Sequence, residues 1–80
     1  MGVKDAVARR FSGICKARNM TANELASVAG VTPSSVYSML DASRRNVSIV
    51  LIKKLCDGLE ISLGEFFSAP EFDELEQEIV

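Results

Sequence analysis

The chain has no histidine and no tryptophan, and only two cysteines and two prolines among its 80 residues. Cys15 and Cys56 stand 41 positions apart and outside any CxxC pair, so neither a zinc site nor a Cys–His nucleophile can be assembled. We expect both to be core thiols, because a free cysteine packs as a small hydrophobe, with a disulfide between them as the less favoured alternative. The sequence therefore predicts no catalytic residue, no metal site, no cofactor and no enzyme activity.

Long apolar runs are missing as well. The longest unbroken aliphatic run is Ile49–Ile52, whereas a membrane helix needs about 20 apolar residues, and the N-terminus lacks the apolar stretch of a signal peptide. Eighty residues suffice for one small domain, and a composition of 48% apolar and 25% charged residues is typical of globular chains. We expect a soluble, cytoplasmic protein with no membrane partner.

Basic residues are absent from the last 26 positions. Residues 1–54 hold all nine bases against three acids, a net charge of +6, whereas residues 55–80 hold eight acids, a net charge of −8. The overall charge of −2 hides this division. Because exposed charges more than about 10 Å apart are largely screened at physiological salt, a basic face in the first part can still attract phosphate.

Apolar spacing predicts helices along the whole chain and no strand. The first helix, 4–18, places four apolar residues on one stripe: Val7, Phe11, Ile14 and Cys15. The fourth helix, about 49–59, places five on one face: Ile49, Ile52, Leu55, Cys56 and Leu59. Ser62–Glu65 has the pattern of a capping box that opens a short fifth helix, and Pro70 stops that helix.

Two short helices joined by a tight turn are predicted between Thr21 and Asp41. Thr21–Glu24 is a capping box, and Gly30 stands where a helix ends in a left-handed residue. Thr32 and Pro33 then supply an N-cap and a first-turn proline for the next helix. The inward positions of the pair are Leu25, Ala26, Ala29, Gly30, Val31, Val36 and Met39, with small residues where the backbones come close. This pattern is typical of a helix-turn-helix, whose second helix enters the DNA major groove.

The segments MTANELASVAGVTPSSVYSML at 20–40 and IKKLCDGLEISLGEFF at 52–67 resemble the lambda-repressor-like, or Cro/repressor (XRE), helix-turn-helix DNA-binding domain. The resemblance covers about residues 4–68. It implies an all-α, five-helix bundle in residues 1–69, followed by an acidic C-terminal tail at 70–80. It also implies a groove-facing set on the third helix, Thr32, Pro33, Ser34, Tyr37 and Ser38, and phosphate contacts from Ala22, Asn23, Arg44, Arg45 and Asn46.

The chain departs from the family pattern at three positions. Ala22 replaces a common Gln, so only backbone amides remain there to bind a phosphate. Cys15 and Leu40 stand where an Arg and a Glu often form a partly buried ion pair, an exchange that leaves the fold intact because both charges are gone.

The third helix also lacks Arg, Lys, Asn and Gln, the side chains that read guanine or adenine through two hydrogen bonds. Ser34, Ser35 and Ser38 offer only single, rotatable hydroxyls. We therefore expect Tyr37 to be the main side chain in the groove, with much of the selectivity coming from DNA shape and half-site spacing.

Two surface features have two interpretations each. Arg44-Arg45-Asn46 is either a phosphate clamp, which we favour, or an ordinary solvated loop. Five further apolar residues either form a two-fold dimer contact matched to half-sites about 34 Å apart, or belong to a tail that folds back as a sixth helix on its own subunit. These dimer candidates are Val50, Leu51, Phe72, Leu75 and Ile79.

We expect a sequence-specific DNA-binding transcriptional regulator, with repression as the default mode, double-stranded DNA and a second copy as partners, and no small-molecule ligand. The alternative is a protein-interaction module of the same fold, such as an antitoxin or a complex subunit, that uses the acidic tail and Val50-Leu51.

Overall fold

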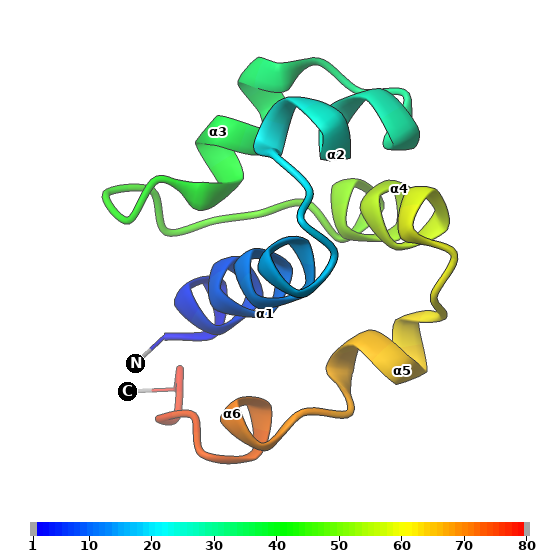
Figure 1. The fold of residues 1–80 in the computed structure, drawn as a ribbon. Helices are drawn as coiled ribbons and strands as arrows, with labels where there is room; N and C mark the ends of the chain where they lie inside the picture. Colours follow the sequence, from blue (N-terminus) through cyan, green and yellow to red (C-terminus); the bar gives the residue numbers. More distant parts are fainter. Residues whose placement is uncertain (1, 80) are drawn as a thin grey trace.

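The computed structural model describes residues 2–79, which form helices and no strand (Figure 1). The helices are α1 (Val3–Ala17), α2 (Ala22–Ala29), α3 (Pro33–Leu40), α4 (Ile49–Leu59), α5 (Leu63–Phe67) and α6 (Pro70–Asp73). The predicted all-α fold with five main helices is confirmed, and the sixth helix is a single turn that begins at Pro70. Within residues 2–79, no helix combines the length and the apolar character needed to cross a bilayer.

Local chemistry places the helix ends as predicted. Thr21 and Glu24 form the capping box, with the Thr21 hydroxyl accepting from the Glu24 amide at 3.1 Å and the Glu24 carboxylate accepting from the Thr21 amide at 2.9 Å. Gly30 ends α2 in the left-handed region with φ +68°. At α5, the Ser62 hydroxyl accepts from the Glu65 amide at 3.0 Å, which is one half of the predicted box.

The helices enclose one apolar core. In Figure 1, α1 runs through the middle, with α2, α3 and α4 above it and α5 and α6 below it. The largest fully buried side chains are Phe11, Phe66, Leu25, Met39, Leu55 and Leu59. The Phe11 and Phe66 rings lie 4.3 Å apart between centroids, which joins α1 to α5 across the core.

The backbones of α2 and α4 approach each other closely at Gly58. An ideal Cβ built on Gly58 would lie 2.8 Å from the Cα of Ala29, a distance that no real side chain tolerates. At Gly30, by contrast, a Cβ would meet no described atom within 4 Å, so this glycine serves the positive φ alone. The expected close contact at the turn is therefore corrected: it joins Ala29 to α4, and its essential residue is Gly58.

Two expectations about α4 are wrong. Ile49 was assigned to the inward face but is 57% exposed, because it lies in the first turn, nine residues and about 13 Å from the Gly58 contact. Leu51 was expected off the inward face but is half-buried against the core. The exposed apolar pair at the start of α4 is Ile49 and Val50.

The cysteines are both free thiols. Cys56 is fully buried, whereas Cys15 is half-buried at the edge of the core. Cys15 and Leu40 line one apolar hollow of about 260 Å³, so these two positions lie in the same part of the fold. Burial raises the pKa of both the Cys15 and the Cys56 thiol, so both stay protonated at neutral pH.

Candidate nucleic-acid interface

α3 presents one face to the core and the other to solvent. Val36 and Met39 are buried at 0% and 2% exposure, which fixes the rotation of the helix. Tyr37 lies between them in sequence and is therefore turned outward, where its side chain is 54% exposed. Ser34 shares this outer face and is exposed. The phenol is the largest group that the helix offers to a ligand.

The other hydroxyls of this helix are less available. The Thr32 hydroxyl accepts a hydrogen bond from the Ser35 amide at 3.2 Å and lies 3.0 Å from the Ser35 hydroxyl, so these two side chains cap the helix together. Pro33 occupies the first turn and is exposed, and Ser38 is half-buried. Among the groove-facing residues predicted from sequence, Ser34 and Tyr37 are thus the exposed polar side chains that do not cap the helix.

The loop between α3 and α4 is ordered by Asp41. The amide and the hydroxyl of Ser43 donate to one Asp41 carboxylate oxygen at 2.9 and 2.8 Å, and these hydrogen bonds hold the Asp41 pKa below its usual value. Arg44 lies 3.8 Å from the other carboxylate oxygen, yet its side chain is 63% exposed. The guanidinium is therefore positioned next to α3 and remains open to solvent.

A groove joins this loop to α3. It has a volume of about 290 Å³, and its lining includes Ser34, Ser38, Arg44 and Asn46. The structure thus brings together three serines of α3, Ser34, Ser35 and Ser38, with one cation and one amide of the loop, and the lining includes no acidic residue. This is the strongest geometric support for a shared phosphate and base contact.

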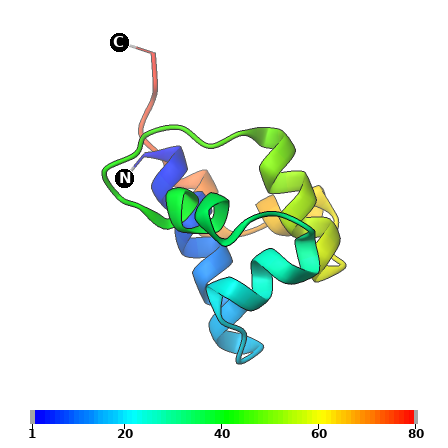
Figure 2. The ribbon, with the colours of Figure 1, turned by 90° about the horizontal axis from the view of Figure 1, so that it is seen from above.

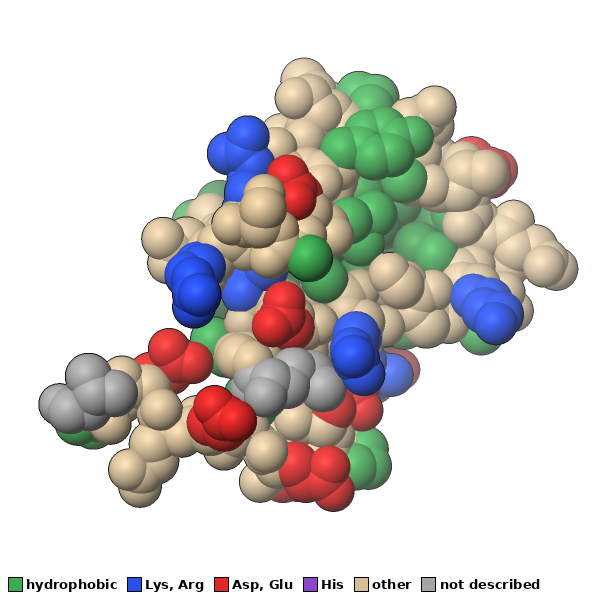
Figure 3. Space-filling view, turned by 90° about the vertical axis from the view of Figure 1, so that its left-hand side faces the viewer, with side chains coloured by type: hydrophobic (Ala, Val, Ile, Leu, Met, Phe, Trp, Pro, Cys, Tyr) green, Lys and Arg blue, Asp and Glu red, His purple; other side chains and the backbone are tan. Residues whose placement is uncertain are grey.

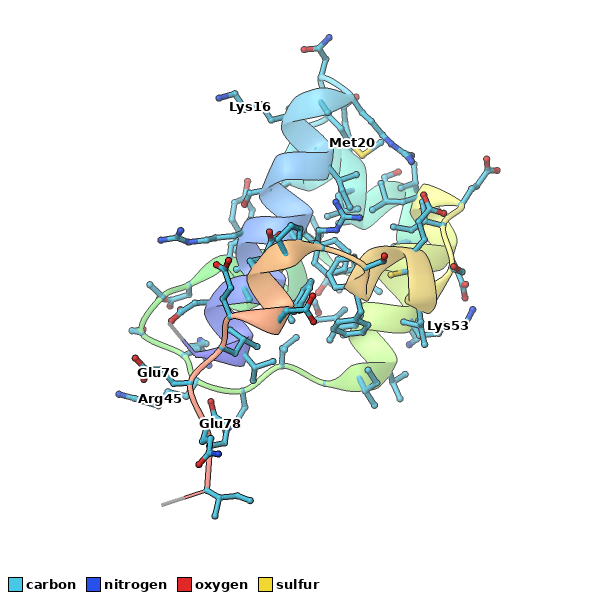
Figure 4. The ribbon with its side chains drawn as sticks, turned by 90° about the horizontal axis from the view of Figure 1, so that it is seen from below. Lys16, Met20, Arg45, Lys53, Glu76 and Glu78 are labelled. Carbon is cyan, nitrogen blue, oxygen red and sulfur yellow. The ribbon has the colours of Figure 1, made fainter. Side chains whose placement is uncertain are left out.

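Arg45 lies on the other side of the loop. It lines a separate hollow of about 510 Å³ together with Lys4, Gly2 and Glu78. Figure 4 shows Arg45 at the same end of the molecule as Glu76 and Glu78 of the tail. All three residues of the predicted trio Arg44-Arg45-Asn46 line this hollow, and Arg44 and Asn46 also line the groove beside α3.

The start of α2 lies at the edge of the same domain surface. Ala22 is half-buried against the core and offers only its backbone, whereas Asn23 is exposed. Figure 2 shows α2 and α3 side by side, with the loop after α3 arching away toward α4. A ligand laid along α3 can therefore reach both the loop and the start of α2.

Three of the nine bases donate to backbone carbonyls at helix ends, which qualifies the simple charge count. Lys4 is 4% exposed and donates to the carbonyl of Asp41, at the end of α3. Arg10 donates to the carbonyls of Phe66 and Glu65 at 2.8 and 3.0 Å, at the end of α5. Arg18 donates to the carbonyl of Leu59 at 2.8 Å, at the end of α4. These cations satisfy helix C-terminal carbonyls and interact favourably with the helix dipoles.

The other charged side chains form a basic region and an acidic region on the surface. Figure 3 shows basic side chains spread over the face that carries the loop, with acidic side chains gathered toward its lower part. Lys53 is paired with Asp57 on α4. Arg44 is paired with Asp41 yet exposed, and Arg9, Lys16, Arg45 and Lys54 are exposed with no ion pair to another residue of 2–79.

The dimer candidates do not share one element or one side of α1. Val50 is 59% exposed at the start of α4, above α1 in Figure 1. Phe72, in α6 below α1, is half-buried, with its ring 5.8 Å from Phe66 and 4.9 Å from Phe67. Leu75 is half-buried and Ile79 is 88% exposed. The division of the chain at residue 70 stays a prediction, with Phe72 beyond that boundary in contact with the core.

Comparison with known proteins agrees with this geometry. The sequence model of the Cro/C1-type HTH DNA-binding domain family matches residues 10–71. The fold is similar to that in the crystal structure of the prophage Lp1 protein 11, with a TM-score of 0.81 and 29% sequence identity over 94% of this chain and 100% of that chain. No curated protein matches the sequence.

Proposed function

The chain belongs to the Cro/C1-type helix-turn-helix DNA-binding domain family, and from this premise we propose that it is a sequence-specific transcriptional regulator that represses by occupying operator DNA. Occupancy needs no chemistry, which agrees with a site made of hydroxyls, an amide and guanidinium groups. Such a regulator acts on DNA in the cytoplasm and requires neither a cofactor nor a small-molecule ligand.

The observation that carries this proposal is the exposed face of α3 beside the loop. Tyr37 and Ser34 point outward, and Arg44 and Asn46 share a groove with Ser34 and Ser38. With α3 in the major groove, the loop lies over the adjoining backbone, where a guanidinium binds phosphate. We propose phosphate contacts from Arg44, Arg45, Asn46 and the first amides of α2 at Ala22 and Asn23. Further contacts to DNA come from α3 and its cap, at Thr32, Pro33, Ser35 and Ser38.

The basic test is binding to a random-sequence duplex, measured by gel shift or fluorescence anisotropy. We expect a non-specific dissociation constant on the order of 1–100 µM, which weakens as salt is raised. Arg44→Gln should make the slope of log K against log salt shallower by about 0.9, the value of one phosphate contact. Lys54→Gln is the matched control, because Lys54 is an exposed cation on α4. The absence of any binding at low salt would favour the protein-interaction function instead.

Sequence reading is tested at Tyr37. An operator selected from a random library should lose more affinity with Tyr37→Ala than a scrambled duplex does, because Tyr37 is the largest exposed side chain on the outer face of α3. Tyr37→Phe separates the hydroxyl from the ring. An equal loss of affinity on selected and scrambled duplexes would remove Tyr37 from the reading role.

We also propose that the chain acts as a homodimer on paired half-sites. The support is the exposed apolar pair Ile49 and Val50 at the start of α4, at 57% and 59% exposure. A two-fold interface buries the same patch of both copies, so the two aliphatic side chains of each copy place four aliphatic side chains in the interface. Leu51, Phe72, Leu75 and Ile79 stay candidates for the edge of such an interface.

A further inference from the structure

The acidic tail is attached to the body of the protein. Phe72 holds α6 to the aromatic cluster of α5, and Leu75 is half-buried further along. From there the chain passes the start of α1, as Figures 1 and 2 show, and Figure 2 shows its last residues extending away from the body. The carboxylates that follow Leu75 therefore have a defined position beside α1.

That position is next to the loop between α3 and α4. Glu78 lines the same hollow as Arg44, Arg45 and Asn46, and a Cβ built on Gly2 would lie 3.9 Å from a Glu78 carboxylate oxygen. Figure 4 shows Glu76 and Glu78 at the same end of the molecule as Arg45. The cations of the predicted phosphate clamp thus have tail carboxylates as neighbours in the free protein.

The negative charge of the tail opposes the approach of DNA phosphates to this loop. The tail carries five acids and no base within residues 70–79: Glu71, Asp73, Glu74, Glu76 and Glu78. A duplex carries one negative charge per about 1.7 Å of its axis, and charges interact over about 8 Å at physiological salt. Carboxylates on the rim of the hollow therefore repel a phosphate that approaches Arg45, and they stabilise its guanidinium when no phosphate is present.

We propose that the acidic tail is an autoinhibitory segment, in which Glu76 and Glu78 neutralise the Arg45 side of the loop until a DNA phosphate displaces them. The inference rests on the proposed DNA-binding function and describes how that same site is regulated. The tail lowers the affinity for every duplex, because phosphates are common to all sequences. It thereby suppresses non-specific binding and leaves selectivity to the contacts of α3.

The test uses the full chain with Glu76→Gln and Glu78→Gln combined, two substitutions at exposed positions. Binding to a labelled random-sequence duplex is measured by fluorescence anisotropy at several salt concentrations between about 50 and 200 mM. We expect the variant to bind about three- to tenfold more tightly at the low end, since one exposed charge pair changes an equilibrium constant by up to about fivefold. The gain should shrink as salt is raised.

The matched control is Glu60→Gln with Glu65→Gln, which removes the same net charge from exposed positions near the corner between α4 and α5. Figure 1 places this corner on the far side of the molecule from the loop. A control that gains as much affinity as the tail variant, or a tail variant with wild-type affinity, overturns the autoinhibitory role.

Repeating the tail substitutions in a protein that lacks the Arg45 charge separates a local contact from a general effect of net charge. In Arg45→Gln, the tail substitutions should raise affinity less than they do in the wild type, and an undiminished gain contradicts the proposal. If neither the wild type nor the tail variant binds DNA at low salt, the regulatory function itself fails and this inference falls with it. Binding by the tail variant alone supports both.

Discussion

Gly58 and Gly13 both lie inside helices, yet only Gly58 has a neighbour where a side chain would project. A Cβ at Gly58 would lie 2.8 Å from both the Cα and the amide nitrogen of Ala29, whereas a Cβ at Gly13 would meet nothing within 4 Å. The two glycines therefore separate close packing from helix propensity, and substitution by alanine should act in opposite directions at the two sites.

We predict that Gly58→Ala destabilises the protein by about 1–3 kcal/mol, because α2 must move away from α4 to admit the methyl group. Gly13→Ala should stabilise it by about 0.5–1 kcal/mol, since alanine has a higher helix propensity than glycine and nothing opposes it. Urea unfolding followed by circular dichroism measures both. An unchanged free energy of unfolding for Gly58→Ala would contradict the prediction, because α2 and α4 would then separate without loss of stability.

At the scale of the elements, α1 acts as the connector of the bundle. Its cations reach the C-terminal carbonyls of α3, α5 and, from the residue that follows the helix, α4. Each of these helices ends with carbonyls that lack a partner within the helix, so a guanidinium or ammonium group there both donates hydrogen bonds and favours the negative end of the dipole. The apolar stripe of α1 and this polar set together explain why one helix contacts most of the others.

We predict that Arg10→Met destabilises the protein by about 1–2 kcal/mol, since it removes two hydrogen bonds from a charged donor to Phe66 and Glu65 while methionine keeps the apolar stem. Arg9→Met, at the exposed neighbouring position, is the control and should change stability by less than about 0.5 kcal/mol. Thermal unfolding detects the difference, because about 1 kcal/mol shifts the midpoint by about 4–8 °C in a domain of this size. Equal shifts for the two variants would count against the role of Arg10 at the end of α5.

At the scale of the whole molecule, the open question is how many copies bind DNA. Ile49 and Val50 form an exposed aliphatic pair, and the start of α4 is adjacent to the loop that carries Arg44. A dimer formed there would place two copies of α3 on the same duplex, in keeping with paired half-sites one helical turn apart.

We predict that Ile49→Ser combined with Val50→Ser shifts the protein from dimer to monomer in sedimentation at micromolar concentration, while the monomer keeps the helical circular dichroism of the wild type. The reason is that both side chains face solvent in a single copy and therefore contribute little to its own core. Val28→Ser, at a 49% exposed position on α2, is the control and should leave the mass unchanged. A wild type that sediments as a monomer of 8.7 kDa would contradict the dimer.

The sequence by itself determined where the helices begin and end, because capping residues act locally. Thr21, Gly30 and Thr32 act on atoms at most three residues away, so their roles follow from spacing alone, and the helix bounds agree with the prediction within one residue at α2 and α3. The outward turn of Tyr37 was readable for a similar reason. Val36 and Met39 identify the inward face, and the 3.6-residue period of the helix then places Tyr37 on the outer face.

Only the tertiary structure determined the burial and the contacts that involve residues far apart in the sequence. Spacing along α4 could not reveal that Ile49 is exposed, nor that the backbone of Gly58 packs directly against Ala29. It likewise could not separate a lysine on the surface from Lys4, whose ammonium lies against a carbonyl 37 positions away. Side chains such as Arg45 and Glu78 come together only when the chain has closed on itself, since no periodicity relates residues that are 33 positions apart and on different elements.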